Sequence, residues 1–508
     1  MSVPAELQDK HDRLEAVRLS ADDSVAVALT DLSRGHIAHL SGIAVELRSD
    51  VPAHHKFALR DHAQGDPIIR FGNVIATATM AIGAGEHVHT HNAGTMLSGT
   101  RSYAFRSVAP KNVQARQQPD RTFQGYRRAD GRVGTRNEIW IIPTVGCVAR
   151  VCEQIARQAR QFMHGNVDAI ESFPHVLGCS QLGDDLAATR DILAGLLAHP
   201  NAGGVLLVGL GCENNQANLL LASAGTLTPD RVKTLIAQSS SDEVEDGVVA
   251  VRELMDAATR DVRTPCDMAD LVIGLKCGGS DALSGVTANP LLGELTDRVT
   301  AAGGSAILTE IPEIFGAEHL LMERAASPEV FEQIATLVND FKSHFLDHGQ
   351  KIHENPSPGN KVGGITTLEE KSLGAVQKAG HAIVTDVIRY GQRIRAPGLT
   401  LLEAPGNDAV SSTALAAAGA TIILFTTGRG TPLGFPVPTI KIASNSALVE
   451  RKPGWIDFDA GRKLDPDQTE SLGDRFLEYV LEVAGGAQTA NERNGEKSIA
   501  IWKRGVTL

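Results

Sequence analysis

From Gly125 onward, short apolar segments alternate with longer amphipathic ones, and this alternation constrains the fold more than any other feature of the chain. EIWIIPTV precedes VARVCEQIARQARQFM, GGVLLVGL precedes NNQANLLLASA, and DLVIGLK precedes a glycine-rich loop and then NPLLGELTDRVTAAG. Further units begin at SAILTEI and LTLLEA, and the apolar segment TIILFTTG follows them. Strand–loop–helix units of this length favour parallel sheets that are covered by helices. We therefore predict an α/β fold of parallel βα units, arranged as two subdomains.

The residues before about Arg101 follow a different pattern, with short β-rich segments interrupted by glycine turns. Examples are SVAVALTDL and NVIATATMAIGAGEHVHTH. This pattern predicts a small β-rich domain ahead of the α/β region. The predicted order is an N-terminal tail, the β-rich domain, an exposed linker, and middle and C-terminal α/β domains, spanning residues 1–22, 23–101, 102–124, 125–355 and 356–508. The stretch ENPSPGNKVGG marks the last boundary or is a functional loop inside one region.

Charge and cysteine content exclude several classes of partner. The chain has 508 residues, with 48 Lys and Arg against 60 Asp and Glu, for a net charge of −12. We expect no nucleic-acid or membrane partner, because no basic field attracts one and no apolar stretch is long enough to span a bilayer. The charged N-terminus does not resemble a secretory signal, and the 6 cysteines do not resemble a disulfide framework. A cytoplasmic protein is therefore expected, and a homo-oligomer is possible.

Cysteines recur where predicted strands end. Cys147, Cys212 and Cys277 each follow an apolar strand, and Cys179 lies between a short strand and a helix. Ligand sites in open parallel sheets form at the carboxyl ends of the strands, so we expect several of these groups to share one cavity. Each thiol is either a small buried hydrophobic side chain or a ligand or nucleophile.

Sequence context narrows the chemistry of these thiols. GCSQ, GCEN and KCGGSD place Cys179, Cys212 and Cys277 beside glycine at predicted helix starts, where a thiolate is favoured. No CxxC spacing supports a zinc ribbon or a local redox pair. As an alternative to a single ion, these three thiolates could hold an iron–sulfur cluster, as in some hydro-lyases.

The segment EHVHTH carries the sharpest local signal. Alternate residues of a strand point to the same face, so His87, His89 and His91 would present three imidazoles together. Fe(II), Mn(II) and Zn(II) suit such ligands. The alternative is a solvated polar face near the end of a strand.

Two glycine-rich segments suit the binding of a polar small molecule. GGSDALSGVTANP combines flexible backbone with hydroxyls and a carboxylate, and NPSPGNK adds a cation that could bind a substrate carboxylate. Either segment could instead be only a turn. Neither fits a P-loop or a GxGxxG fingerprint, so an NAD-dependent oxidoreductase has little support.

Long ordered motifs connect the chain to a known family. They include YRRADGRVGTRNEIWIIPTVGCV, GCSQLGDD, HPNAGGVLLVGLGCENNQ, LKCGGSDALSGVTANP, ENPSPGNKVGGITTLEEKSLG and NERNGEKSIAIWKRGVTL. From about Asp23 to Leu508, the chain resembles the altronate/galactarate dehydratase family of sugar-acid hydro-lyases. The region around GEHVHTHN resembles an SAF (β-clip) domain.

The resemblance implies a reaction and a cofactor. The reaction is conversion of D-altronate, a small aldonate, to 2-dehydro-3-deoxy-D-gluconate and water, aided by Fe2+ or Mn2+, with the small and large domains acting jointly. A galactarate, aldarate or sulfolactate-type lyase and a non-catalytic sugar-acid binder are the alternatives. Dehydration removes the proton alpha to a carboxylate and expels hydroxide, so it needs a base, an acid and a cation against the carboxylate.

These requirements assign the candidate residues to three roles. The predicted metal ligands are His87, His89, Cys179, Cys212 and Cys277. The candidates for proton transfer are Asp281, Asp184, Glu213 and His91, of which His91 could also be a third imidazole ligand. The substrate-binding candidates are Lys361, Arg429, Ser280, Asn289 and Asn360.

Overall fold

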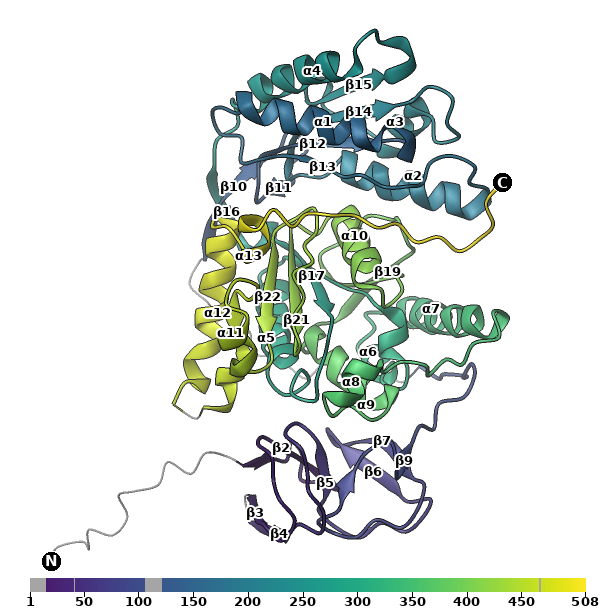
Figure 1. Cartoon of the computed structure of the whole chain (residues 1–508), viewed down its shortest axis with the longest axis vertical. Coiled ribbons are helices and arrows are strands. Elements are labelled where there is room, and N and C mark those ends of the chain that lie inside the picture. The colour runs from purple at the N-terminus through teal and green to yellow at the C-terminus, as the bar shows by residue number, and fades with distance from the viewer. Residues whose placement is uncertain (1–14, 41, 106–120, 466) are drawn as a thin grey trace, which may run out of the picture.

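The computed structural model describes residues 15–40, 42–105, 121–465 and 467–508. These residues form three units, each built around its own sheets: an N-terminal β domain, a unit with a four-stranded sheet and a unit with a seven-stranded sheet. Figure 1 shows the seven-stranded unit in the middle, with the β domain and the four-stranded unit at opposite ends.

The N-terminal domain consists of short antiparallel strands. One sheet has the order β1-β2-β5-β8, a hairpin joins β3 to β4, and a three-stranded sheet has the order β6-β7-β9. The strands are β1 (Ala16–Val17), β2 (Val25–Ala28), β3 (Ile37–Leu40), β4 (Ile43–Glu46), β5 (Lys56–Ala58), β6 (Pro67–Arg70), β7 (Asn73–Ala78), β8 (His87–Val88) and β9 (Ala93–Gly94).

The second unit contains a parallel sheet with the order β13-β12-β14-β15 and an antiparallel sheet with the order β11-β10-β16. The strands are β10 (Thr122–Arg127), β11 (Val133–Gly134), β12 (Glu138–Pro143), β13 (Ile170–Ser172), β14 (Ala202–Gly209), β15 (Val232–Ile236) and β16 (Thr264–Asp267). The helices are α1 (Ala149–Ala159), α2 (Gly183–Leu197), α3 (Ala217–Ala224) and α4 (Glu243–Ala258).

Strand β12 shows why helices cover both faces of this parallel sheet. Ile139 and Ile141 pack in the core that includes residues of α1 and α4, whereas Trp140 and Ile142 pack in the core that includes residues of α2 and α3. Both sets of side chains are fully buried, as expected for a parallel strand.

The largest sheet is parallel throughout, with the order β19-β20-β18-β17-β21-β22-β23. Its strands are β17 (Val272–Cys277), β18 (Ser305–Leu308), β19 (Val384–Ile388), β20 (Gly398–Leu402), β21 (Ile422–Thr427), β22 (Thr439–Ala443) and β23 (Phe458–Asp459). Its helices are α5 (Ala288–Ala301), α6 (His319–Met322), α7 (Pro328–Asp347), α8 (Pro358–Val362), α9 (Leu368–Ala375), α10 (Asp408–Ala418), α11 (Ser446–Arg451), α12 (Thr469–Ala484) and α13 (Ala490–Arg493).

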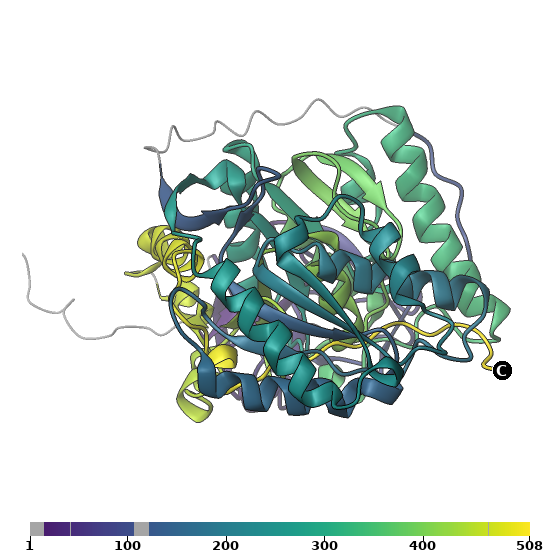
Figure 2. The same cartoon turned by 90° about the horizontal axis from the view of Figure 1, so that it is seen from above.

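Helix α10 joins the two α/β units, because it packs against both α2 and β17. Viewed from above, the four-stranded unit lies over the rest of the molecule (Figure 2). Both α/β units also contain short 3-10 helices. These are η1 (Gly146–Val148), η2 (Arg160–Phe162), η3 (Pro229–Arg231), η4 (Ala237–Ser239), η5 (Met268–Asp270), η6 (Ile311–Ile314), η7 (Val376–Ala379) and η8 (Ala460–Leu464). No helix in the described ranges combines the length and apolarity needed to cross a membrane.

The predicted α/β fold with a β-rich N-terminal domain is confirmed. The predicted boundary at residues 355/356 differs from the sheet structure. The seven-stranded sheet takes β17 and β18 from before this point and β19–β23 from after it, so the stretch ENPSPGNKVGG is a loop and helix within one unit. Most of the predicted linker, residues 106–120, and residues 1–14 of the predicted tail lie outside the described residues.

Candidate active site between the β domain and the seven-stranded sheet

Three buried charged residues hold the β domain against the seven-stranded unit. Arg70 donates to the Glu370 carboxylate at 2.5 Å and to the Ala282 carbonyl at 2.8 Å. Lys56 lies 2.9 Å from the same carboxylate and donates to the Gly364 carbonyl at 2.6 Å. Removing one partner from such a buried network costs about 3–5 kcal/mol, because an uncompensated charge stays behind. This network therefore fixes the position of the β domain.

Local sequence places the contacting segment of the large unit. Ser357 and Asn360 form a reciprocal capping box, and Pro358 occupies the first turn, so the NPSPGNK motif begins helix α8. Thr367 caps α9 by accepting from the Glu370 amide. These two caps place Asn360 and Glu370 on the side of the segment that faces the β domain and the strand ends.

Four imidazoles of the β domain gather next to this segment, and we call His55, His87, His89 and His91 the histidine cluster. Ring centroids of His55 and His89 are 4.8 Å apart, and those of His87 and His89 are 5.7 Å apart. His87 also lies 5.3 Å from His91 between ring centroids. The structure thus brings the three predicted histidines together and adds His55.

The histidine cluster contacts the large unit directly. His55 Nε2 lies 3.2 Å from the Val362 carbonyl, and His89 Nδ1 lies 3.2 Å from the Thr366 hydroxyl. Strand β8 pairs with β5 so that Phe57 is opposite His87, and Val88 points into the core. The pairing of these strands is what brings His55 to the cluster, and no local sequence pattern indicates it.

Burial lowers the pKa of His55, His87 and His89 and so favours their neutral form. It lowers the pKa of His87 to about 3, and the neighbouring imidazoles of His55, His89 and His91 lower it further in the same direction. Burial, together with the Lys56 charge and His55, lowers the pKa of His89 to about 4. Neutral imidazole is the form that coordinates a metal ion.

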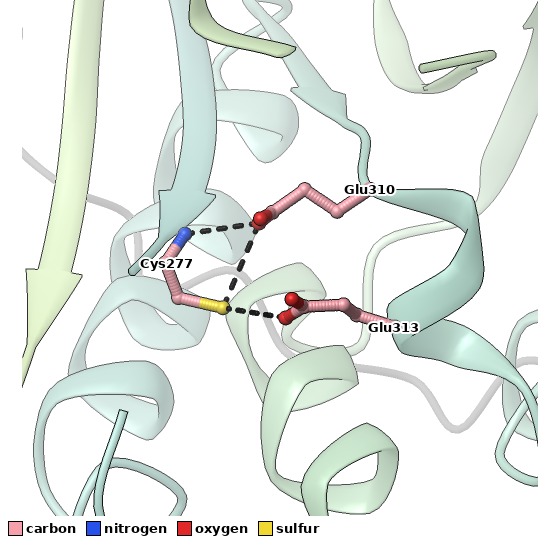
Figure 3. Close-up of side chains that lie close together, drawn as sticks. All are labelled: Cys277, Glu310 and Glu313. Carbon is pink, nitrogen blue, oxygen red and sulfur yellow. Dashed lines mark hydrogen bonds between the residues drawn. The ribbon is translucent and has the colours of Figure 1, made fainter. Parts of the chain in front are cut away.

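A second group of potential ligands lies at the carboxyl ends of β17 and β18. Figure 3 shows Cys277 at the end of β17 facing Glu310 and Glu313, which lie at the start of and within η6. Cys277 Sγ is 3.6 Å from Glu310 Oε2 and 3.5 Å from Glu313 Oε2. Among the described residues, this is the one group of three whose ligand atoms all lie within 4.8 Å of one another, so it could hold a metal ion.

Lysines already balance the charge of this group. Lys276 bonds to Glu310 and lies 2.8 Å from Asp408, Lys378 lies 2.8 Å from Cys277 Sγ, and Lys371 lies 2.9 Å from Glu313. Three ammonium groups thus face three carboxylates. A divalent cation at this position would be repelled by all three lysines.

The charge balance also sets the protonation of the group. Burial raises the pKa of the Cys277 thiol, as does the nearby Glu310 carboxylate, to about 12. Burial by itself raises the pKa of Glu313, but Lys371, Lys276 and Lys378 lower it overall to about 2. Cys277 is therefore a neutral thiol beside the ionised Glu313 carboxylate, contrary to the thiolate expected from its glycine-rich context.

A cavity of about 450 Å³ opens beside this group. It is lined by Cys277, Glu313, Asn355, Asn360, Lys371 and Asp408, among others. A smaller cavity next to it shares Cys277 and Lys371 and reaches Arg70 of the β domain and Asp281. Pockets for small ligands occupy about 300–1,000 Å³, so the larger cavity can take a small organic molecule.

Three of the predicted substrate-binding residues, Ser280, Asn289 and Asn360, line these cavities, as does the proton-transfer candidate Asp281. The Asp281 carboxylate accepts from the Ser444 hydroxyl at 2.8 Å and the Asn445 amide at 3.0 Å, and it lies 3.6 Å from His54 Nδ1. Asn360 donates to the Ser280 carbonyl at 2.8 Å. These contacts place Asp281 between the β domain and the strand ends.

Asn289, Lys361 and Arg429 differ in availability. Asn289 is buried; its side chain donates to the Gly374 carbonyl and accepts from the Thr426 hydroxyl. Lys361 is half-buried, and its ammonium group forms no hydrogen bond or ion pair within the described ranges. Arg429 is exposed and makes one long contact of 3.5 Å to the Gly359 carbonyl.

Four predicted site residues are not brought to this region. Cys179, Cys212, Asp184 and Glu213 belong to the four-stranded unit, which lies at the far end of the molecule from the β domain (Figure 1). The prediction treated all strand ends as one edge, whereas the strands form two separate sheets. Glu213 accepts from the Gly211 and Leu210 amides and the Thr144 hydroxyl, which is a structural role.

Residues that the sequence analysis did not single out complete the site. They are His54, His55, Glu313, Lys371 and Lys378. Lys371 lies within GGITTLEEKSLG. This motif supports the family resemblance, but its sequence does not indicate a role for the lysine. The others become neighbours only through pairing of distant strands and docking of the two units.

Comparisons with known proteins cover nearly the whole chain. Residues 14–96 match the altronate/galactarate dehydratase SAF domain, residues 125–259 match the second domain of D-galactarate dehydratase/altronate hydrolase, and residues 268–507 match the C-terminal domain of D-galactarate/altronate dehydratase. The two later ranges correspond to the four-stranded and seven-stranded units.

Three relatives illustrate the similarity. The altronate dehydratase of Escherichia coli (strain K12) is 49% identical over 97% of this chain and 100% of its own length. The altronate dehydratase of Bacillus subtilis (strain 168) is 48% identical over 97% of this chain and 99% of its own. The galactarate dehydratase (L-threo-forming) of Escherichia coli (strain K12) is 34% identical over 87% of each chain. Together with the fold and the site, these matches show that the chain belongs to the altronate/galactarate dehydratase family of hydro-lyases.

Proposed function

We propose that this chain dehydrates D-altronate to 2-dehydro-3-deoxy-D-gluconate and water, with the substrate bound between the β domain and the seven-stranded sheet. The observation that carries the proposal is the identity of 49% to an altronate dehydratase over 97% of the chain, against 34% to a galactarate dehydratase. The cavity of about 450 Å³ lined by Cys277, Glu313 and Asn360 fits a six-carbon acid.

The substrate carboxylate needs a cation that is not already used. Lys371 is engaged by Glu313, Asn355 and Asn360. Lys361 and Arg429 are the available cations near α8, so we assign the carboxylate to them. Asn360 and the backbone at Ser280 then face the hydroxyl groups.

Proton transfer is assigned to Asp281 with His54, and to His91. The 3.6 Å separation between Asp281 and His54 allows the carboxylate to orient the imidazole, or to exchange a proton with it, while the C2 proton is removed. His91 is exposed at the edge of the histidine cluster and can return a proton to the departing hydroxyl. Asp184 and Glu213 are omitted because they belong to the four-stranded unit.

The histidine cluster suits the divalent ion that the family implies. His55, His87 and His89 are neutral nitrogen donors within or directly beside the paired strands β5 and β8, and imidazole nitrogen suits Fe2+. A bound ion would act as a Lewis acid toward the substrate's carboxylate and hydroxyl oxygens. The chain's own contribution is to hold these imidazoles neutral and oriented against Val362 and Thr366.

The experiment is a keto-acid assay over a panel of aldonates and aldarates, run anaerobically with Fe2+, Mn2+ or Zn2+. We expect D-altronate to give the 3-deoxy-2-keto acid with the highest kcat/KM. Faster turnover of galactarate than of D-altronate would show that the substrate is galactarate, as the name of the 34% identical relative states for that protein. Recovery of every acid unchanged after long incubation with metal-loaded protein would identify a binder and contradict the proposal.

A further inference from the structure

Three of the six cysteines are exposed, and all three lie at one edge of the four-stranded sheet. Cys147, Cys179 and Cys212 follow β12, β13 and β14, which are neighbours in the parallel sheet. Carboxyl ends of neighbouring parallel strands meet at one edge. The other cysteines, Cys152, Cys266 and Cys277, are buried. We call the three exposed residues the cysteine edge.

The loops that carry the cysteine edge are bonded to one another. The Gly146 amide donates to the Leu177 carbonyl at 2.8 Å, and the Asn215 amide donates to the Gly178 carbonyl at 3.0 Å. The Asn215 side chain also donates to the Thr144 carbonyl at 3.2 Å. Backbone and side-chain bonds therefore join all three loops into one surface, and each loop presents one thiol on it.

A glycine precedes each cysteine of the edge, and the close packing of the loops requires it. A Cβ at Gly178 would lie 2.2 Å from the Thr144 carbonyl oxygen, and one at Gly146 would lie 2.9 Å from the His175 carbonyl oxygen. Gly211 has φ of +129°, and a Cβ there would lie 2.6 Å from Gln238. None of the buried cysteines follows a glycine. The repeated Gly-Cys pair thus brings the thiol-bearing loops together.

Hydrogen-bond donors face two of the three sulfur atoms. Gln238 Nε2 lies 3.5 Å from Cys212 Sγ, and the Ser180 hydroxyl lies 3.9 Å from Cys179 Sγ. Donors of this kind stabilise thiolates and tune sulfur-ligated metal centres. Cys277, by contrast, faces two carboxylates, and its pKa is raised.

Three exposed thiols on one hydrogen-bonded surface can share a multinuclear metal centre. Cysteine thiolates are the usual ligands of iron–sulfur clusters. We propose that Cys147, Cys179 and Cys212 bind an iron–sulfur cluster in which one iron lacks a protein thiolate.

This assignment differs from the cluster alternative considered from sequence, which used Cys277 in place of Cys147. Cys277 lies on the other sheet and is buried among lysines and glutamates. The iron without a thiolate faces the exposed side of the edge, where an oxygen donor such as a carboxylate or hydroxyl can bind. The cluster site is separate from the dehydration site, so the two proposals stand or fall independently.

The test begins with the full chain purified without oxygen and then incubated with ferrous and ferric iron and sulfide. Iron, acid-labile sulfide and visible absorption are measured per chain. We expect wild type to hold iron and sulfide, and Cys147→Ser, Cys179→Ser and Cys212→Ser each to lose most of both. Cys152→Ala and Cys277→Ser serve as controls that keep the cluster. Far-UV circular dichroism of each variant without cluster verifies that it is folded.

Thiol labelling gives a second readout. A maleimide should modify the three exposed cysteines in the cluster-free chain and be blocked at these positions after loading. The proposal is overturned by any of three results: wild type that binds no iron and sulfide, loss of the cluster in Cys277→Ser but not in Cys147→Ser, or stoichiometric zinc without sulfide. Turnover of D-altronate by protein that lacks a cluster is expected, because the two sites are separate.

Discussion

At the scale of single residues, the site depends on which charged groups are already paired. Buried cations of the seven-stranded unit, such as Lys276 and Lys378, are paired with carboxylates, whereas Lys361 pairs with none in the part of the chain that the structure describes. Asp281 accepts several hydrogen bonds and also lies near His54 of the β domain. Substitutions at Lys361 and Asp281 therefore test binding and chemistry separately.

Lys361→Ala should weaken substrate binding and leave the chemical step nearly intact. A charge-assisted hydrogen bond contributes about 1.5–3 kcal/mol, which corresponds to a rise in KM for D-altronate of roughly 10- to 160-fold. Steady-state kinetics measure KM and kcat, with the exposed Lys351→Ala as the matched control. An unchanged KM would remove Lys361 from the binding of the carboxylate.

Asp281→Asn should abolish exchange of the substrate C2 proton with solvent deuterium, because the amide cannot accept the proton. The measurement is proton NMR of D-altronate incubated with enzyme in deuterium oxide. Asp184→Asn, on the four-stranded unit, should retain the exchange. Retained exchange in a folded Asp281→Asn variant would show that another group removes the proton.

At the scale of elements, the segment from α8 to α9 connects the histidine cluster to the strand ends. Its turn at Gly364 has φ of +89°, and a Cβ there would lie 2.1 Å from the His54 carbonyl oxygen. Gly364→Ala should therefore displace the segment and lower kcat/KM for D-altronate at least about tenfold, which corresponds to about 1.4 kcal/mol. Kinetics with the purified variant measure this change.

The control for this substitution is Gly349→Ala. Gly349 also has positive φ, +66°, but no atom lies within 4 Å of the position that a Cβ would take there. The two variants share the conformational cost and differ in the clash with His54. Equal kcat/KM in both would show that contact between the segment and the β domain does not matter for turnover.

Sequence periodicity predicted the strands and helices themselves, but it did not predict which strands lie next to one another in a sheet. The alternation of apolar and amphipathic segments indicated parallel βα units, and alternate positions of EHVHTH indicated that His87 and His89 would lie together. His55 joins them only because β5 pairs with β8. The order of strands in a sheet depends on long-range packing, so the separation of Cys179 from Cys277 could not be read from local patterns.

At the scale of the whole molecule, the proposed site requires the β domain to stay docked. The Arg70–Glu370–Lys56 network carries much of this interaction and is fully buried. Burial by itself raises the pKa of Glu370, but Lys56 and Arg70 lower it below its ordinary value of 4.5. A lowered carboxyl pKa stabilises the folded state above pH 4.5, and this stabilisation is lost as the pH falls through the folded-state pKa.

Docking should therefore weaken in acid in wild type and be weak at every pH in Glu370→Gln. We expect the variant to lose about 3–5 kcal/mol of stability at neutral pH, because two buried cations lose their partner. The measurement is thermal unfolding of both proteins over a pH series. This role would be contradicted if the midpoint temperature of wild type stayed constant as the pH fell below 4 and Glu370→Gln unfolded at the wild-type temperature at neutral pH.

The proposed function depends on imidazoles of the β domain and strand-end loops of the seven-stranded unit forming one dehydration site. The most direct measurement is bound metal and kcat for D-altronate in His87→Ala and His89→Ala. His164→Ala, an exposed histidine of the four-stranded unit, is the control. We expect both cluster variants to lose metal and turnover while the control keeps them. Full metal occupancy with unchanged kcat in His87→Ala and His89→Ala would contradict the proposed site.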